Sequence, residues 1–295
     1  MELLESLIAT HRNFRGCKVP TPQDRPMIRA VDRRNEASRI TGVKTFSLQS
    51  GSNGNAIYVE ANGTRLLFDA GITGVQAQRR MAGHGCDICE VDALLISHDH
   101  VDHIRSAGVY QRKFGLPIYM TQKTQQATWC KLGQLSEVRH FKAGESLTFD
   151  GVTVHTIPTP HDAADGVAFV VECEGKRLGI LTDLGHPSKS LQELLESVDA
   201  AYLECNFDPT LLEQGAYPPA LKARIRGPGG HLSNDDSAQL LRACGPRAPQ
   251  WIAVAHLSQD NNRPELAMDA QRAAVGREYP VFHASRYGSS EMFTV

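Results

Sequence analysis

Apolar and polar residues alternate along several segments of the chain, a pattern typical of half-buried β-strands. A first strand is predicted at 43–50. Three hairpins are predicted at 55–71, 146–158 and 167–183, with turns at Asn62-Gly63, Asp150-Gly151 and Glu174-Gly175. Asn-Gly and Asp-Gly are preferred two-residue hairpin turns, since both residues tolerate positive φ. These segments therefore predict antiparallel strand pairs.

Between and after the hairpins, helical periodicity alternates with short, wholly apolar segments. The apolar segments predict strands at 93–97, 117–120, 200–206 and 251–257. The periodic segments predict helices at 75–82, 102–114, 122–131, 188–197, 233–243 and 264–275. Hairpins mixed with β-α units favour an α/β fold of two mixed sheets between helices, rather than one doubly wound parallel sheet.

The N-terminal segment differs from the rest of the chain. Between residues 10 and 44 there are nine Lys or Arg residues and three acidic ones, and Pro20, Pro22 and Pro26 interrupt any regular element. We interpret residues 1–42 as a basic arm and residues 43–295 as one domain. A solvated tail is a simpler explanation of this arm than a dedicated binding segment.

Composition sets few limits on function. The 295 residues include 31 Lys and Arg and 33 Asp and Glu, a net charge of −2, and 41% are hydrophobic. This excludes disordered and fibrous classes and gives no support to a strongly basic nucleic-acid-binding domain, although a local basic patch is compatible with it. No segment has the roughly 18 apolar residues of a membrane span, and the N-terminus does not resemble a signal peptide. We therefore expect no membrane partner and a cytoplasmic location.

The strongest chemical signal is the segment His98–His103, which directly follows an apolar strand. Its sequence, His-Asp-His-Val-Asp-His, places three imidazoles and two carboxylates in six residues. Imidazole nitrogen suits zinc and similar ions, and carboxylate oxygen also binds harder ions such as manganese. We therefore predict a metal-binding loop at a sheet edge.

This motif and its position resemble the signature of the metallo-β-lactamase superfamily. The resemblance implies an αββα sandwich of two mixed sheets flanked by helices. It also implies that Asp69 orders the ligand loop without binding metal. One ion would be held by His98, His100 and His161, the other by Asp102, His103 and His256, with Asp183 shared between them.

Such a centre predicts a hydrolase that uses two divalent ions, either zinc or manganese, with iron as a further candidate. Two cations about 3.5–4 Å apart activate a water for attack and neutralise charge on the leaving oxygen. No serine or cysteine nucleophile is needed. The oxygen-reducing branch of the superfamily has Glu where this chain has His100, so a redox role is disfavoured. A binding protein with a vestigial site is also disfavoured, because the ligand set is complete.

Two further residues resemble those of transfer-RNA-processing zinc phosphodiesterases. Glu204 ends an apolar strand, and His231 follows Gly229-Gly230 before a helix. The resemblance implies that this pair delivers a proton to the leaving oxygen, and Asp102 is expected to be catalytic as well as a ligand. Ser233 also fits a helix N-cap, which explains the serine but not the preceding Gly-Gly-His.

Several motifs in order resemble the YycJ/WalJ (VicX) group of small bacterial metallo-β-lactamase-fold proteins. They lie at residues 47–60, 95–108, 156–169, 180–185, 202–234 and 254–267. Members are described as nucleases that degrade double-stranded DNA from 5′ to 3′, so the resemblance implies a DNA exonuclease. The alternatives are an RNA-processing nuclease and a small-molecule hydrolase that acts on a thioester, a lactone or a cyclic phosphodiester.

Candidate substrate-binding residues lie outside the ligand motifs. They are Ser52, Asn53, Lys222, Arg224, Arg226 and Asn261. The loop at 50–55, rich in Gly and Asn, could expose backbone N–H groups to a phosphate or could simply form a tight turn, and both explanations stay open. Bound metal and local cations would make the site positive despite the net charge. We therefore predict modest nucleic-acid affinity with visible salt dependence.

Overall fold

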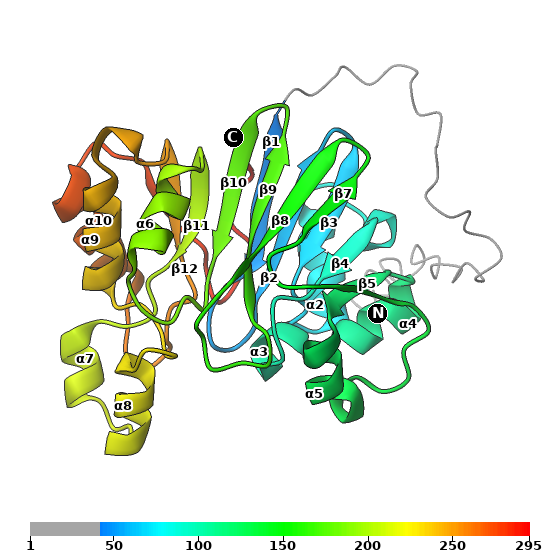
Figure 1. Cartoon of the computed structure of the whole chain (residues 1–295), viewed down its shortest axis with the longest axis horizontal. Coiled ribbons are helices and arrows are strands. Elements are labelled where there is room, and N and C mark those ends of the chain that lie inside the picture. The colour runs from blue at the N-terminus through cyan, green and yellow to red at the C-terminus, as the bar shows by residue number, and fades with distance from the viewer. Residues whose placement is uncertain (1–41) are drawn as a thin grey trace, which may run out of the picture.

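Two β-sheets pack face to face, and helices cover their outer surfaces (Figure 1). The computed structural model describes residues 42–295. Within that range each sheet has seven strands and mixes parallel with antiparallel pairing. The predicted α/β sandwich of two mixed sheets between helices is therefore confirmed.

The first sheet combines the N-terminal strands with the extreme C-terminus. Its spatial order is β14 (Phe293–Thr294), β1 (Val43–Gln49), β2 (Ala56–Ala61), β3 (Thr64–Phe68), β4 (Ala93–Leu95), β5 (Ile118–Thr121) and β6 (Val138–Phe141). The strands from β14 to β3 pair antiparallel, and those from β3 to β6 pair parallel. The predicted turn at Asn62-Gly63 links β2 to β3, where both residues have positive φ.

The second sheet is built from the later strands. Its spatial order is β13 (Val281–His283), β12 (Trp251–Ala255), β11 (Ala200–Glu204), β10 (Lys176–Leu181), β9 (Val167–Cys173), β8 (Val152–Pro158) and β7 (Ser146–Phe149). The other two predicted hairpins are present as β7–β8 and β9–β10. β10 to β13 are parallel, and β8 runs in the same direction because two antiparallel pairings separate it from β10.

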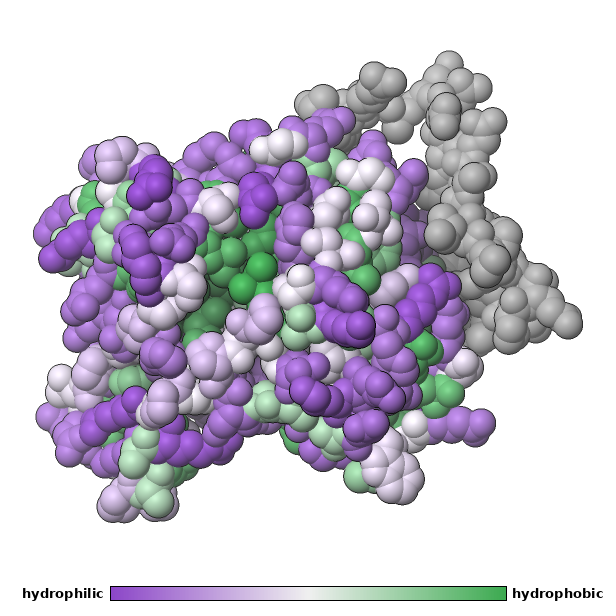
Figure 2. All heavy atoms as spheres, in the orientation of Figure 1, coloured by the Kyte–Doolittle hydropathy of each residue, from purple (hydrophilic) through white to green (hydrophobic). Residues whose placement is uncertain are grey.

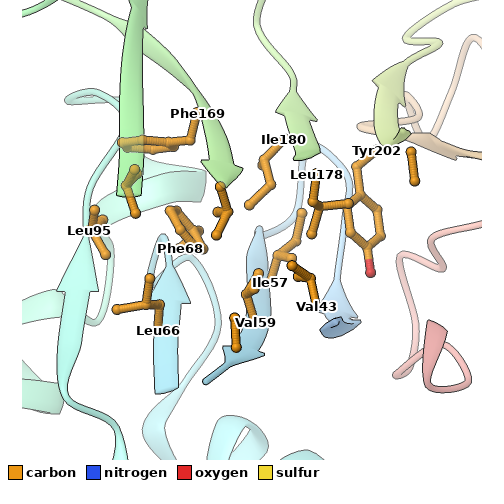
Figure 3. Close-up of a cluster of buried hydrophobic side chains, with 14 of the residues drawn as sticks. Val43, Ile57, Val59, Leu66, Phe68, Leu95, Phe169, Leu178, Ile180 and Tyr202 are labelled. Atoms are coloured by element: carbon orange, nitrogen blue, oxygen red, sulfur yellow. The ribbon is translucent and has the colours of Figure 1, made fainter. Parts of the chain in front are cut away.

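The apolar positions of both sheets face each other in the main core. Figure 3 shows Ile57, Leu66 and Phe68 of the first sheet opposite Phe169 and other apolar residues of the second. The Phe68 and Phe169 ring centroids are 5.0 Å apart. Burial of these side chains removes a large apolar area from water, which is the main favourable contribution to folding.

Two further apolar clusters attach helices to the outer faces. The first sheet is covered by α2 (Gly74–Gly83), η2 (Ile88–Glu90), α4 (Ala107–Phe114) and α5 (Gln122–Leu132). The second sheet is covered by α6 (Lys189–Glu196), α9 (Asn234–Cys244) and α10 (Pro264–Val275). On the face shown in Figure 2, the surface is mostly hydrophilic, with a hydrophobic hollow near its middle.

The helix predicted at 102–114 is wrong as one element. The chain forms α3 (Val101–Ile104), then breaks and restarts as α4. At the break, Ser106 N donates to the carbonyl of Ala70, while Ala70 N donates to the carbonyl of His103. These tertiary hydrogen bonds replace helical ones, and so the propensity for a continuous helix is overridden.

Two short helices near the site were not predicted at all. They are α7 (Pro209–Gln214) and α8 (Pro219–Arg226), which extend from the second sheet at the lower left of Figure 1. Proline usually interrupts helices, but here Pro209 and Pro219 each occupy the first turn, where the missing N–H has no helical partner in any case. The Asp208 side chain also caps α7 by accepting a hydrogen bond from Leu211 N.

The predicted basic arm, residues 1–42, lies outside the described residues except for residue 42, and both its role and the division at residue 43 stay predictions. None of the helices along residues 42–295 is both long and apolar enough to cross a bilayer. The cytoplasmic location stays a prediction as well.

The substitution Phe169→Ala should lower the free energy of unfolding by about 3–5 kcal/mol, because it leaves a cavity between the sheets. Urea unfolding at a fixed metal concentration would measure this. Trp129→Ala is a suitable control, since the Trp129 side chain is 73% exposed and its removal should change the free energy by at most about 0.5 kcal/mol. Equal effects of the two substitutions would contradict the assignment of the core.

Candidate metal centre

The predicted metal ligands all follow the carboxyl ends of strands that run in one direction. The ligand loop follows β4, and the other predicted ligands, His161, Asp183 and His256, follow β8, β10 and β12. Since the two sheets face each other, these ends meet along one edge of the sandwich. The topology thus brings together residues up to 158 positions apart, from His98 to His256.

The donor atoms converge at this edge in four groups of potential ligands that partly overlap, and two of the groups match the two predicted ion sites. In one group, His98, His100 and His161 have one nitrogen each within 4.8 Å of the others. In the second group, Asp102, His103 and His256 meet the same condition. Asp183 lies between them: its Oδ1 is 3.5 Å from His161 Nε2 and its Oδ2 is 3.3 Å from His103 Nε2.

Two atoms in the middle of the cluster show why it suits a cation. His98 Nε2 and Asp183 Oδ2 are buried, yet neither has a hydrogen-bond partner. A buried polar atom without a partner costs about 1–3 kcal/mol, so such atoms are rare in native proteins. A neutral imidazole nitrogen and a carboxylate oxygen are ligands of divalent transition metals. The cluster therefore suggests divalent metal binding.

In His98 and His161, the ring nitrogen that points away from the cluster is held by a specific partner. His98 Nδ1 lies 2.9 Å from Ser97 Oγ, and His161 Nδ1 donates to the carbonyl oxygen of Gly230 at 2.9 Å. An added Cβ at Gly230 would meet the Ile225 carbonyl, so only glycine allows this approach. Such outer contacts orient a ring and make its free nitrogen available to a metal.

Asp69 holds the ligand loop through three hydrogen bonds. Its Oδ1 accepts from Ser97 N at 2.8 Å, and its Oδ2 accepts from Ser97 Oγ and from His103 Nδ1 at 2.9 and 2.7 Å. No group of potential metal ligands within the described part of the chain includes Asp69. This geometry agrees with an ordering role for Asp69.

Three residues of the site have an unusual backbone conformation. Asp69, Asp183 and His256 have φ values of 63°, 58° and 56°, each directly or almost directly after a strand. Residues other than glycine rarely adopt this left-handed region. Such strain, about 1–3 kcal/mol per residue, concentrates at functional sites, where the surrounding structure enforces it.

Glu204 connects two histidines at the end of β11. The carboxylate is fully buried, and its Oε1 accepts from His231 Nδ1 at 2.8 Å and from His256 Nδ1 at 3.1 Å. Its Oε2 accepts from the backbone N–H groups of Leu184 and Leu232. Burial opposes ionisation, but the charge and hydrogen bond of His231, with the hydrogen bond of His256, lower the pKa of Glu204 to about 2.

The histidines divide into two classes by pKa. Burial lowers the pKa of His98 well below its usual value and also lowers that of His100, which favours the neutral, metal-binding form. Burial also lowers the pKa of His103 and His256, but neighbouring carboxylates raise it by more. Asp183 is the largest of the charges that raise the pKa of His103 well above its usual value and that of His256 to about 10.

The cluster forms the floor of a pocket of about 390 Å³. Asp102, Asp183, His100, His231 and His256 line it at the bottom. One wall includes residues of α8, and the opposite wall includes Lys131 of α5. In Figure 1, α8 and α5 lie on either side of α3.

The family is established by comparison with known proteins. The model of the beta-lactamase superfamily domain matches residues 64–252. The chain is 32% identical over 256 residues to exodeoxyribonuclease YycJ of Bacillus anthracis, an alignment that covers 86% of this chain and 94% of that protein. It is 36% identical over 231 residues to exodeoxyribonuclease WalJ of Streptococcus pneumoniae strain D39, covering 77% and 86%.

The chain belongs to the beta-lactamase superfamily, in its metallo-β-lactamase-fold YycJ/WalJ-like group. Among solved structures, the metallo-β-lactamase-fold protein YhfI of Bacillus subtilis matches with a TM-score of 0.67 and 16% identity. That match covers 86% of this chain and all of YhfI. At this identity it supports the fold alone.

The predicted substrate residues of this YycJ/WalJ-like protein occupy different environments. Ser52 and Arg224 line the pocket. Asn53 lies beside it, where its Nδ2 donates to the carbonyl of Arg286. Asn261 is fully buried, and its Oδ1 lies close to Gly215.

Lys222 and Arg226 point toward α7 instead. Lys222 Nζ donates to the carbonyl oxygen of Glu213, and Arg226 pairs with the Glu213 carboxylate at 2.6 Å. In the loop at 50–55, Gly54 has φ of 149°, and an added Cβ would lie 2.6 Å from the Gly71 carbonyl oxygen. The tight-turn explanation of this loop therefore accounts for Gly54.

Several residues that line the pocket were missed by the sequence analysis, among them Lys131, Asp162, Asn206 and Tyr217. Asp162 directly follows the predicted ligand His161, so its place in the sequence could have indicated that it lies at the site. The other residues show no pattern in the sequence, because elements far apart in the chain bring them to the pocket. The predicted N-cap is confirmed: Ser233 and Asp236 form a capping box at the start of α9.

Replacing Asp69 with Asn should weaken metal binding about 10- to 100-fold, since an amide holds His103 and Ser97 less firmly than a carboxylate. Competition with a chromophoric chelator would measure the affinity. Asp150→Asn is a matched control, because Asp150 lies in the β7–β8 turn, outside the cluster, in a conformation that Asn tolerates. If Asp69→Asn keeps the affinity of the parent protein, the ordering role is wrong.

Metal affinity should rise with pH. In protein stripped by a chelator, the raised pKa values keep His103 and His256 protonated at neutral pH, and an incoming ion must displace those protons. Each proton released should raise the apparent affinity about tenfold per pH unit, until the pH passes the pKa of the ring that releases it. For His256 that pKa is about 10. Chelator competition at several pH values between 6.5 and 9 would check this, and a pH-independent affinity would contradict it.

Proposed function

We propose that this protein is a metal-dependent nuclease that degrades double-stranded DNA from its 5′ ends. The observation that carries the proposal is the combination of full-length similarity with a convergent ligand set. The similarity to two exodeoxyribonucleases extends over 94% and 86% of their lengths. The donor atoms of the predicted ligands converge beside one pocket, which is lined by His100, Asp102, Asp183 and His256.

We further propose that the site holds two divalent ions, zinc or manganese, with iron as a further candidate. His98, His100 and His161 would hold one ion, and Asp102, His103 and His256 the other, with Asp183 between them. When bound, such ions activate water and neutralise charge on the phosphate oxygens. The lack of a hydrogen-bond partner at the buried atoms Asp183 Oδ2 and His98 Nε2 supports this assignment.

Three residues are proposed to act directly on protons. Asp102 lines the pocket, where its carboxylate can accept a proton from the attacking water as well as bind metal. His231 also lines the pocket, and its Nδ1–H group donates a hydrogen bond to Glu204. In the imidazolium form, whose charge the Glu204 carboxylate balances, Nε2 carries a second proton, which it gives to the departing oxygen, and the ring becomes neutral. Glu204 acts through His231, since it is fully buried and out of reach of a substrate.

The direct test is digestion of labelled duplexes by the purified full chain, after metal removal and addition of manganese or zinc. Duplex DNA labelled at its 5′ ends should release the label early in short products, while 3′-labelled duplex should shorten progressively. A matched RNA duplex should be degraded more slowly. His100→Ala should abolish cleavage, and His155→Ala, at a half-buried position of β8 outside the pocket lining, should not.

Cleavage of bis(p-nitrophenyl) phosphate without degradation of any nucleic acid would favour the small-molecule hydrolase instead. Faster degradation of RNA than of DNA would favour the RNA-processing nuclease. Unchanged cleavage by His100→Ala would contradict the metal assignment itself.

His231→Ala should lower kcat on DNA by about 10²- to 10⁴-fold, the usual contribution of a positioned acid, while metal content stays normal. The loss should be much smaller on bis(p-nitrophenyl) phosphate, because p-nitrophenolate leaves without protonation. Elemental analysis and kinetics on both substrates would measure these effects. An equal loss on both substrates would exclude His231 as the proton donor.

A further inference from the structure

Only one of the three basic residues on α8 is directed at the pocket. Arg224 lines it, whereas Lys222 and Arg226 both contact Glu213 of α7. These contacts hold α8 against α7 and fix which side of α8 faces the metal cluster. Because Arg224 lies on that side, the packing of α8 against α7 directs its side chain to the pocket.

Arg224 is also tied to the edge of the ligand cluster. Its Nε donates to Asp162 Oδ2 at 2.5 Å, and Asp162 Oδ1 lies 3.7 Å from His161 Nε2 and 3.9 Å from His100 Nε2. The Arg224 side chain nonetheless remains 59% exposed. Its two terminal nitrogens can thus bind an anion in the pocket while Nε stays bound to Asp162.

A second cation reaches the pocket from the opposite wall. Lys131 lies in the last turn of α5 and is exposed. Among residues 42–295 no carboxylate pairs with it. The end of α5 is held firmly, since Leu132 is buried and the Arg112 guanidinium donates to the carbonyls of Leu132 and Gln134.

We propose that Lys131 and Arg224 bind the backbone phosphates on the two sides of the phosphodiester at the metal centre. This inference rests on the proposed nuclease function. A DNA strand carries one negative charge per nucleotide, so phosphates next to the reacting one extend toward both walls. Arg binds a phosphate with two parallel hydrogen bonds, and Lys acts as a mobile point charge.

Such contacts position a strand but do not read its sequence. The pocket floor carries mostly carboxylates and imidazoles, and the proposed metal ions would balance the charge of those carboxylates. Without cations on the walls, the neighbouring phosphates would meet Asp99 and Asp162, which also line the pocket. Arg224 offsets Asp162 directly, and Lys131 supplies the positive charge on the other side.

The test compares Lys131→Ala and Arg224→Ala with the parent protein on a duplex and on bis(p-nitrophenyl) phosphate. Each variant should bind a phosphorothioate-protected duplex less tightly, and the slope of log affinity against log salt should fall by about 0.9. Cleavage of the small diester should fall much less than cleavage of the duplex, because the diester has no neighbouring phosphates. Lys131→Arg and Arg224→Lys should restore part of the duplex affinity.

Lys189→Ala and Arg242→Ala control for the loss of one surface charge, since these residues lie on α6 and α9 outside the pocket lining. They should leave the salt slope unchanged. The inference is overturned if Lys131→Ala and Arg224→Ala keep the parent salt slope, or if they lose as much activity on the small diester as on DNA. A parent protein that cleaves the small diester but no nucleic acid would instead overturn the proposed function, and this inference with it.

Discussion

The hydrogen bond on the outward nitrogen of each buried ring is the interaction on which the site depends. Ser97, Asp69, Gly230 and Glu204 supply it to His98, His103, His161 and His256, respectively. Because an imidazole has only two nitrogens, occupying one of them fixes the tautomer and aims the other at the cluster. The partners come from both sheets, so the site can form only when the sandwich closes.

Closure also explains the strained backbone at the strand ends. Asp69, Asp183 and His256 follow β3, β10 and β12, and most residues of these strands are buried. Each apolar strand is held on both faces, by the central core and by an outer helical cluster. A well-packed strand tolerates about 1–3 kcal/mol of strain in the residue that follows it. In this conformation the side chains of Asp183 and His256 reach the cluster of potential ligands, and that of Asp69 reaches Ser97 and His103.

The sequence predicted the parts of the site that rest on local patterns and missed those that rest on tertiary contacts. The three hairpins follow from the alternation of apolar and polar residues, and the other strands follow from short apolar segments. The ligand loop follows from the concentration of His and Asp residues at 98–103. The break after α3 does not, because it comes from the hydrogen bonds of Ala70, far away in the sequence. α8 was missed because none of its residues is buried, so it has no apolar face whose periodicity could reveal it. Lys131 has no local signature at all.

A net charge of −2 says little about the substrate, because the charges are segregated. Buried carboxylates such as Asp183 and Glu204 face imidazoles and, on our proposal, metal ions, so they do not repel a polyanion at the surface. The effective field near the substrate comes from exposed groups on the pocket walls. If Arg224 and Lys131 supply this field, the attraction of DNA to the pocket depends on a few contacts to the phosphate backbone and on no contact to the bases. An enzyme of this kind would degrade DNA without sequence preference, and its affinity would be set by salt.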